Sequence, residues 1–254
     1  MSSIAAPTPP PLFLFADSAL LFWRVEGRPF LDCLRVLTGA ELRVPPVRAA
    51  YLGASNGDVP AFYEVFTAAM EGIGITHCRA IPASPTPQDL DWLASADIIL
   101  LAGGDPRVGW EAFRAHGVDA LLQERHRAGA VLIGVSAGAM QLGQGLWAEP
   151  LPVEGEPLPA LGLAPFLVGV HEAPEWQGLR RALQQAGYPH RALGIPLGGG
   201  LLVHADGSIE PIRHPVIDLG LDPEGRLHES LLLPPVNSYQ GERPAPSEAP
   251  KLLQ

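Results

Sequence analysis

The feature that most constrains the fold is a series of short apolar runs that do not alternate with polar residues. Strands without alternation are buried on both faces, as parallel strands covered by helices are. Helix-like stretches separate the runs; one spans 60–72, with Pro60 at its start and glycines at its end. The expected strands are 12–16, 48–54, 96–103 and 130–136. We therefore predict an α/β fold with a doubly wound, mostly parallel sheet and helices on both faces.

The pattern changes after about residue 145. Residues 145–165 are rich in proline and glycine, which predicts either a long loop or a pair of short strands. The segments expected after it are a strand at 166–170, a helix at 174–187 and a β-hairpin at 200–212 that turns at Asp206 and Gly207. No repeat or linker requires a second domain, so we expect one domain over 1–233 and a mobile tail over 234–254.

Composition excludes several classes of function. The chain has 27 acidic and 17 basic residues, a net charge of −10, and no basic cluster that would follow a phosphate backbone, so nucleic acid is not expected as a partner. The first fifteen residues lack the basic start of a signal peptide, and no apolar stretch approaches the roughly 20 residues of a membrane span. Cys33 and Cys78 are too few for a disulfide framework or a metal knuckle. We expect a cytoplasmic protein that does not bind a membrane.

Ser136 lies between two glycines in the stretch GVSAG, at the end of an apolar run and before a helix-like segment. This pattern, G-x-S-x-G, is typical of a sharp strand-to-helix turn that exposes a nucleophilic serine. The free N–H of Ala137 at the start of the helix is then available to stabilise an oxyanion. The alternative is a structural turn that only requires a small residue.

A second glycine-rich turn follows the preceding apolar run at Gly103, Gly104 and Asp105. Ligands of open parallel sheets bind beyond the carboxyl ends of the strands, so both turns are expected to face one crevice. There Gly104 would offer its backbone N–H, and Gly103 and Asp105 would help to bind the substrate. The alternative role for Asp105 is to cap the helix that follows Pro106.

Three segments, AGGD, GVSAGAM and LGLAP…VGVHE, together resemble the serine peptidase family of dipeptidase E (α-aspartyl dipeptidase) and cyanophycinase. The similarity extends over about 47–212 and implies a fold related to class I glutamine amidotransferases. By this resemblance Ser136 is the nucleophile, His171 is the general base, and Gly104 with Ala137 forms the oxyanion hole.

The chemistry of a nucleophilic serine independently requires a base within hydrogen-bond reach, oriented by a third group. His171 is the best candidate because it follows the apolar run 166–170 and should lie at a strand end. His116 and His126 lie in a helix-like stretch, and His204 lies beside a hairpin turn. A lone histidine is more often an ordinary surface or core residue.

The acid of the triad is not obvious from the sequence. Many relatives have the segment GIDEGTA after the histidine, where this chain has leucine, Leu197, at the acidic position. Dipeptidase E instead takes its acid from between the serine and the histidine, which makes Glu149 our preferred candidate and Glu154 the second, with Glu156 also available. Each of these glutamates alone is more often a solvated surface residue.

The residues that recognise an acidic substrate in cyanophycinase-like members are also replaced in this chain. Gly169, Glu172, Glu175 and Gln177 occupy those positions, and the two carboxylates would repel an acidic substrate. Arg180 and Arg181 would compensate only if their helix turned them into the crevice. No zinc motif or phosphate-binding loop is present, so we expect no metal and no cofactor.

Two functional hypotheses follow from the sequence. The first is a serine peptidase-like hydrolase that cleaves small peptides through Ser136, His171 and a glutamate. The second is a catalytically silent relative that binds a peptide or small ligand. Residues 15–37 are apolar enough to contribute to a homodimer interface, although such stripes are usually core.

Overall fold

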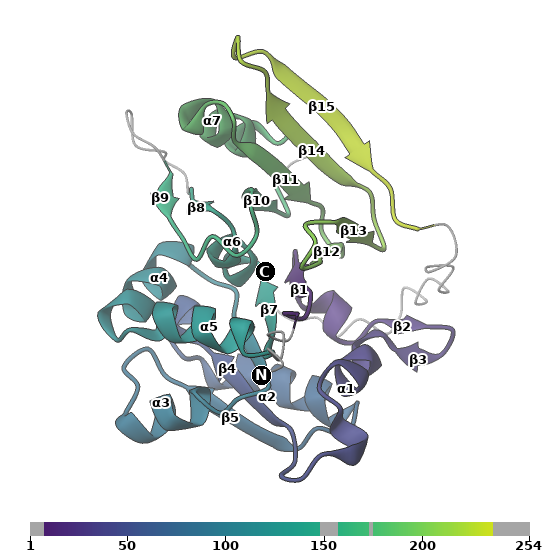
Figure 1. The fold of residues 1–254 in the computed structure, drawn as a ribbon, viewed down its shortest axis with the longest axis vertical. Helices are drawn as coiled ribbons and strands as arrows, with labels where there is room; N and C mark the ends of the chain where they lie inside the picture. Colours follow the sequence, from purple (N-terminus) through teal and green to yellow (C-terminus); the bar gives the residue numbers. More distant parts are fainter. Residues whose placement is uncertain (1–7, 148–156, 173–174, 236–254) are drawn as a thin grey trace, which may run out of the picture.

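The computed structural model describes residues 8–147, 157–172 and 175–235, which form two main sheets (Figure 1). The strands of the larger sheet are β1 (Leu12–Phe15), β4 (Arg48–Leu52), β5 (His77–Ile81), β6 (Ile98–Leu101), β7 (Val131–Val135), β12 (Gly200–Val203) and β13 (Ile209–Ile212). Their order is β13-β12-β1-β7-β6-β4-β5. From β1 to β5 the neighbours are parallel, and only the pairs β1–β12 and β12–β13 are antiparallel, so β12 alone runs in the opposite direction. The predicted α/β fold with a mostly parallel sheet is confirmed.

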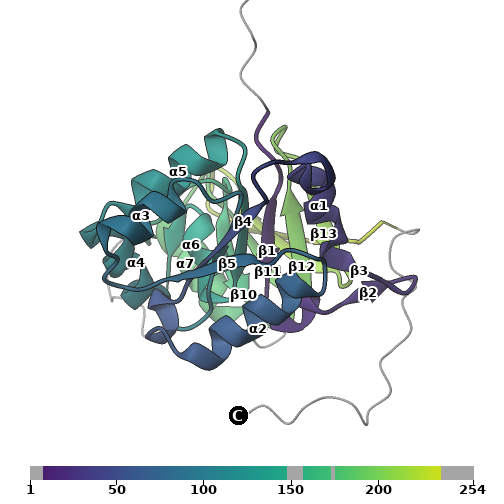
Figure 2. The same cartoon turned by 90° about the horizontal axis from the view of Figure 1, so that it is seen from below.

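The two faces of this sheet are covered by different helices, as the doubly wound prediction requires. The helices are α1 (Cys33–Leu37), α2 (Pro60–Glu71), α3 (Pro87–Leu93), α4 (Pro106–Ala115), α5 (Val118–Arg127) and α6 (Ala137–Leu142), with short 3-10 turns η1 (Ser18–Leu21), η2 (Phe30–Asp32), η3 (Ala40–Leu42) and η4 (Ala54–Asn56). Figure 2 shows α3, α4 and α5 on one side and α2 on the opposite side. Successive side chains of β1 point to opposite faces of the sheet. Leu14 packs in the hydrophobic cluster on the α4 side, and Phe15 packs in the cluster on the α2 side.

The second sheet lies above the larger one in Figure 1, and its strands flank β12 and β13 in the sequence. It consists of β10 (Leu167–Val170), β11 (Arg191–Ile195), β14 (Val216–Leu221) and β15 (Leu227–Leu232), in the order β10-β11-β14-β15. Helix α7 (Gln177–Ala186) connects β10 to β11, which are parallel. One hydrophobic cluster includes Leu132 of the larger sheet with Val168 and Leu219 of the smaller one, so the two sheets share a core.

Two expectations for the second half of the chain are met. The region 145–165 contains a pair of short antiparallel strands, β8 (Gly145–Leu146) and β9 (Leu158–Pro159). The hairpin at 200–212 is formed by β12 and β13, with the Ser208 N–H donating to the Asp206 carboxylate in the turn. The β14–β15 hairpin was not predicted, and residues 236–254 of the expected tail lie outside the described residues.

The segment 15–37 is used mainly as core. Leu20, Leu31 and Leu34 within it are completely buried, around the small hairpin β2 (Arg24–Val25) and β3 (Arg28–Pro29). Phe22 and Val36 remain 54% and 82% exposed. The homodimer interface stays a prediction that rests on these few exposed side chains.

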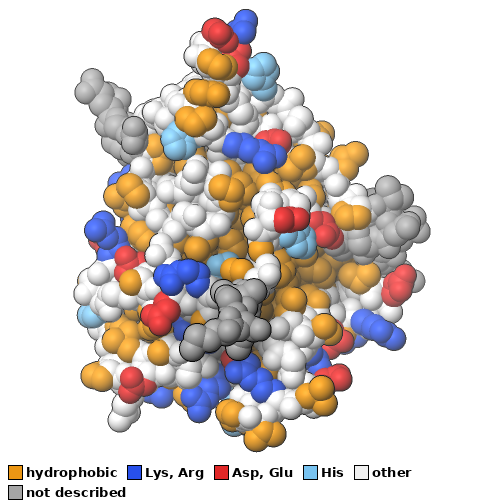
Figure 3. All heavy atoms as spheres, viewed as in Figure 1, with side chains coloured by type: hydrophobic (Ala, Val, Ile, Leu, Met, Phe, Trp, Pro, Cys, Tyr) orange, Lys and Arg blue, Asp and Glu red, His pale blue; other side chains and the backbone are white. Residues whose placement is uncertain are grey.

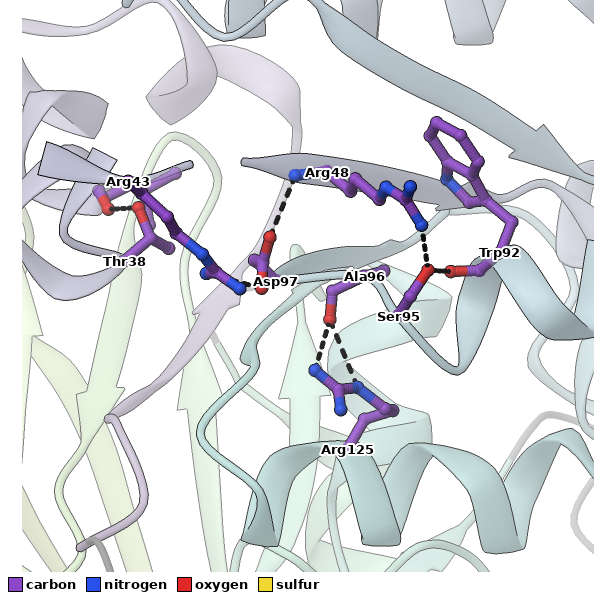
Figure 4. A network of polar contacts seen from close by, with 9 residues as sticks. Thr38, Arg43, Arg48, Trp92, Ser95, Ala96, Asp97 and Arg125 are labelled. Atoms are coloured by element: carbon purple, nitrogen blue, oxygen red, sulfur yellow. Dashed lines mark hydrogen bonds and ion pairs between the residues drawn. The ribbon is translucent and has the colours of Figure 1, made fainter. Parts of the chain in front are cut away.

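A polar network holds the amino-terminal ends of the strands, at the edge opposite the turns singled out in the sequence (Figure 4). The Asp97 carboxylate, just before β6, accepts the backbone N–H of Arg48 at 2.9 Å and pairs with Arg43 at 2.6 Å. The Arg125 guanidinium on α5 donates twice to the Ala96 carbonyl, at 2.8 and 3.2 Å. These bonds fix where β4 and β6 begin relative to the helices.

The surface carries both signs of charge. On the face shown in Figure 3, Lys and Arg side chains are interspersed with Asp and Glu, and hydrophobic side chains lie between them. None of the helices in the described part of the chain has the length and apolar character needed to cross a membrane.

Candidate active site

Ser136 follows β7 directly and precedes α6, so it occupies a sharp strand-to-helix turn at the carboxyl end of the sheet. Its backbone has φ 52° and ψ −111°, a conformation that non-glycine residues rarely adopt. Such strain is found at functional sites, where the surrounding structure holds it in place. Here the Ser136 N–H donates to the Phe15 carbonyl at 2.9 Å, and the Ser136 carbonyl accepts the N–H of Ala139, also at 2.9 Å.

The two glycines of the G-x-S-x-G pattern are required by close backbone packing. A Cβ atom at Gly134 would lie 2.5 Å from the Gly138 carbonyl oxygen, and one at Gly138 would lie 2.1 Å from the Leu101 carbonyl oxygen. Both distances are well inside van der Waals contact, so a side chain at either position would separate α6 from β7 or β6. The glycines therefore let α6 start directly behind the serine.

His171 belongs to the second sheet. It follows β10 directly, and its N–H donates to the Ile195 carbonyl at the end of β11, at 3.0 Å. Its Nε2 lies 2.9 Å from the Ser136 Oγ. At this distance a neutral imidazole with its proton on Nδ1 accepts the serine hydroxyl, which is the geometry of a nucleophile and its base. The site thus forms where the two sheets meet.

No hydrogen bond to the Nδ1 atom of His171 is found within the described residues. The three glutamates proposed as the acid, Glu149, Glu154 and Glu156, lie outside those residues, so their role stays a prediction. Leu197, at the position of the relatives' acid, is 70% exposed in the turn after β11.

Glu172 has a structural role that the sequence interpretation missed. Helix α7 begins after Trp176, whose side chain provides no cap, and the Glu172 carboxylate accepts the N–H groups of Gly178 and Leu179 instead. This cap ties the residue beside His171 to the start of α7. Arg180 pairs with Glu229 on β15, so its guanidinium is bound at the far strand of the second sheet.

The turn after β6 lies against the serine. A Cβ atom at Gly103 would lie 3.2 Å from the Cβ of Ser136, and Gly104 has φ +131°. No hydrogen bond from the N–H of Gly104 or Ala137 is found in the described part of the chain, and their role as oxyanion donors stays a prediction. The Asp105 carboxylate accepts the N–H groups of Arg107 and Val108, at 2.8 and 3.2 Å, and so caps α4. Substrate binding by Asp105 stays a prediction.

Two polar residues behind this turn were not assigned a role from the sequence. Ser55, in the loop after β4, accepts the Asp105 N–H through its carbonyl at 2.8 Å. Gln141 on α6 is completely buried and donates to the Ser55 Oγ at 3.0 Å. The available signal was a glutamine inside the otherwise small and apolar helix AGAMQLG, where a polar residue needs buried partners.

The segments that follow β1 and β13 carry charges of both signs. The Asp17 carboxylate accepts the Gly198 N–H, and the Arg213 guanidinium lies 6.0 Å from the ring centre of Trp23. Burial, and then the positive charge of Arg213, lower the pKa of His214 below its ordinary value. Among the described residues no group of three or more His, Cys, Asp or Glu side chains is placed to hold a metal ion.

Comparison with solved structures supports the fold. The crystal structure of a peptidase from an acI-B1 Actinobacterium is similar over 89% of this chain and 95% of that chain, with a TM-score of 0.66 and 16% identity. A putative peptidase E protein from Listeria monocytogenes EGD-e is similar over 81% of this chain and 99% of that chain, with a TM-score of 0.56 and 17% identity.

The sequence itself gives the family assignment. A search of curated proteins finds no match to the chain. The sequence model of peptidase family S51 matches residues 48–207, more than half of the chain, and this stretch includes both turns and His171. The chain therefore belongs to peptidase family S51.

Proposed function

We propose that this protein is a serine-type peptidase that cleaves small peptides. The observation that carries the proposal is the 2.9 Å contact between the Ser136 Oγ and the His171 Nε2, made by residues that follow strands of two different sheets. Membership of a peptidase family supports the same chemistry.

The mechanism starts with attack of the Ser136 Oγ on the carbonyl carbon of the substrate, while its proton moves to the His171 Nε2. The carbonyl oxygen becomes an oxyanion, and the N–H groups of Gly104 and Ala137 are our candidates to bind it. His171 then gives the proton to the leaving amine, the C–N bond breaks, and an acyl-enzyme forms on Ser136. Water, deprotonated by His171, hydrolyses this ester and restores the serine.

The substrate class follows from the relatives. The Listeria structure is described as a putative peptidase E, and the sequence motifs resemble dipeptidase E, so we propose dipeptides and similarly short peptides as substrates, cleaved in the cytoplasm. Glu149, followed by Glu154, remains our candidate to orient His171.

The test is intact-mass analysis after treatment with a reactive fluorophosphonate. The native chain is expected to gain one adduct, and Ser136→Ala is expected to gain none. Ser208→Ala, which changes a serine in the β12–β13 turn, is the matched control and should react like the native chain. An adduct on Ser136→Ala, or none on a folded native chain, would contradict the proposal.

A second candidate function is a silent relative that binds a peptide without cleaving it. It is favoured by Leu197 at the acidic position and by the Nδ1 of His171, which has no hydrogen-bond partner among the described residues. A native chain that binds short peptides in calorimetry but forms no adduct would support this alternative.

A further inference from the structure

Gln141 connects the nucleophile helix to the neighbouring turn. Its Nε2 donates to the Ser55 Oγ and to the Pro106 carbonyl, both at 3.0 Å. Because a carbonyl oxygen only accepts, the contact with Pro106 fixes which end of the amide is the nitrogen. Pro106 is the first residue of α4, immediately after the turn that contains Gly104.

Ser55 extends this connection to the turn itself. Its carbonyl accepts the Asp105 N–H at 2.8 Å, and a Cβ atom at Gly104 would lie only 2.0 Å from the same carbonyl oxygen. A Cβ atom at Gly109 would lie 2.1 Å from the Ser55 Oγ. The turn is therefore packed against Ser55 without room for a side chain between them.

Burial of the Gln141 side-chain amide lowers the stability of the folded protein. The residue is 0% exposed, and its Oε1 has no hydrogen-bond partner in the described part of the chain. A buried acceptor without a partner destabilises a protein relative to an apolar side chain of the same shape. Stability alone does not explain a glutamine here, whereas a requirement for a fixed geometry does.

We infer that Gln141 is a positioning residue that sets the separation of the two oxyanion donors. The first residue of its helix supplies the Ala137 N–H, and its amide holds, through Pro106 and Ser55, the turn that supplies the Gly104 N–H. This inference rests on the proposed function, because it assigns the residue to the acylation of Ser136. Gln141 touches no reacting atom, so its effect is on the placement of the donors.

The test compares Gln141→Met with Gln123→Met. Methionine keeps the length of the side chain and removes both donated bonds. Gln123 on α5 donates one bond to the Leu161 carbonyl at 3.0 Å, and the Leu161 N–H donates to the Gln141 carbonyl. Gln123→Met therefore reports the cost of losing an amide bond beside the same helix that is not made to the turn. The fluorophosphonate reaction is measured as a maximal rate, kinact, and an affinity, KI. Gln141→Met is expected to lower kinact by about ten- to a hundredfold with KI unchanged, because misplacement by about 1 Å has effects of this size. Gln123→Met should leave both within about twofold.

The outcomes separate this inference from the proposed function. A native chain that does not react overturns the proposed function and this inference with it. A native chain that reacts, with kinact in Gln141→Met equal to that in Gln123→Met, overturns only the role of Gln141. If Gln141→Met does not fold, Ser55→Ala decides, because it removes the acceptor on the turn side with a smaller change of volume. A lowered kinact supports the inference, and an unchanged one overturns it.

Discussion

Ser136 and His171, the proposed nucleophile and base, are held in different ways. Ser136 precedes a helix, α6, in which every residue from Ala137 to Leu142 is buried, and glycine-mediated backbone contacts fix that helix against β6 and β7. His171 is exposed at the end of the smaller sheet, and its backbone is held by one bond to Ile195 and by the cap that Glu172 provides for α7.

Because of this difference, substitutions near Ser136 and substitutions near His171 are expected to have different effects on stability and on activity. Contacts that hold the serine are also the contacts that hold the central sheet, so changes there are expected to damage the fold. Contacts that hold the histidine involve few buried groups, so changes there should reduce activity in a protein that remains folded.

The largest expected effect is on activity, from the base. His171→Asn keeps a residue that tolerates the positive φ of 40° but removes the imidazole. The rate of phosphonylation is expected to fall by about 10³- to 10⁴-fold, since loss of a catalytic base has effects of this order. The melting temperature should stay within about 2 °C, because the side chain is exposed.

The matched control for the histidine is His204→Asn. His204 lies near Glu210 in the β12–β13 hairpin, at 3.5 Å, and is not near the serine. This variant should react at the native rate. If His204→Asn loses as much activity as His171→Asn, the loss in His171→Asn cannot be attributed to removal of a catalytic base.

The second prediction concerns the nucleophile side. Gly138→Ala places a Cβ atom where the Leu101 carbonyl oxygen would be 2.1 Å away, so α6 must shift. We expect the free energy of unfolding, measured in urea, to fall by about 3 kcal/mol, at the upper end of ordinary overpacking. In Gly220→Ala, on β14, the new Cβ would meet no atom within 4 Å, so the free energy of unfolding should change by less than about 1 kcal/mol. Equal losses in the two variants would contradict this account.

A smaller effect is expected from the cap beside the base. Glu172→Ala removes the acceptor of two N–H groups at the start of α7 and should destabilise the protein by about 1 kcal/mol. The phosphonylation rate should fall several-fold, because His171 is adjacent to the lost contact. Glu175→Ala, an exposed glutamate in the same connection, is the control and should change neither quantity. Native rates in Glu172→Ala would show that the cap does not position the base.

The smallest expected effect is the response to acid. His126 is buried just before β7, and burial lowers its pKa below the ordinary value of 6.5. The unfolded chain therefore binds a proton more readily than the folded one, so the melting temperature should decrease as pH falls from about 7.5 to about 5.5. His126→Gln should make this slope shallower without removing it, because the pKa of His214 is lowered too. An unchanged slope would show that His126 does not contribute to the dependence of the melting temperature on pH.

The sequence was informative where local pattern and structure coincide. Apolar runs without alternation located β1, β4, β6, β7 and β10, because strands buried on both faces require such runs. Ser136 and His171 could be proposed because each directly follows one of these runs. The helix expected over 174–187 is α7, which begins a few residues later at Gln177.

The remaining features depend on contacts between distant segments. The sequence does not indicate that β10 and β11 form a separate sheet with the β14–β15 hairpin instead of extending the larger one. Glu172 was considered only as a charge that repels acidic substrates, since its capping contact depends on how the chain turns into α7. Ser55 and Gln141 are far apart in the chain, so no spacing pattern connects them.

The pairing of β1 with β12 has a consequence for synthesis on the ribosome. Leu12, near the start of the chain, is paired with Val203, which is made much later. The larger sheet therefore cannot complete its β1–β12 pair until Val203 has left the ribosome. Until then β1 must remain without one of its neighbours in the larger sheet.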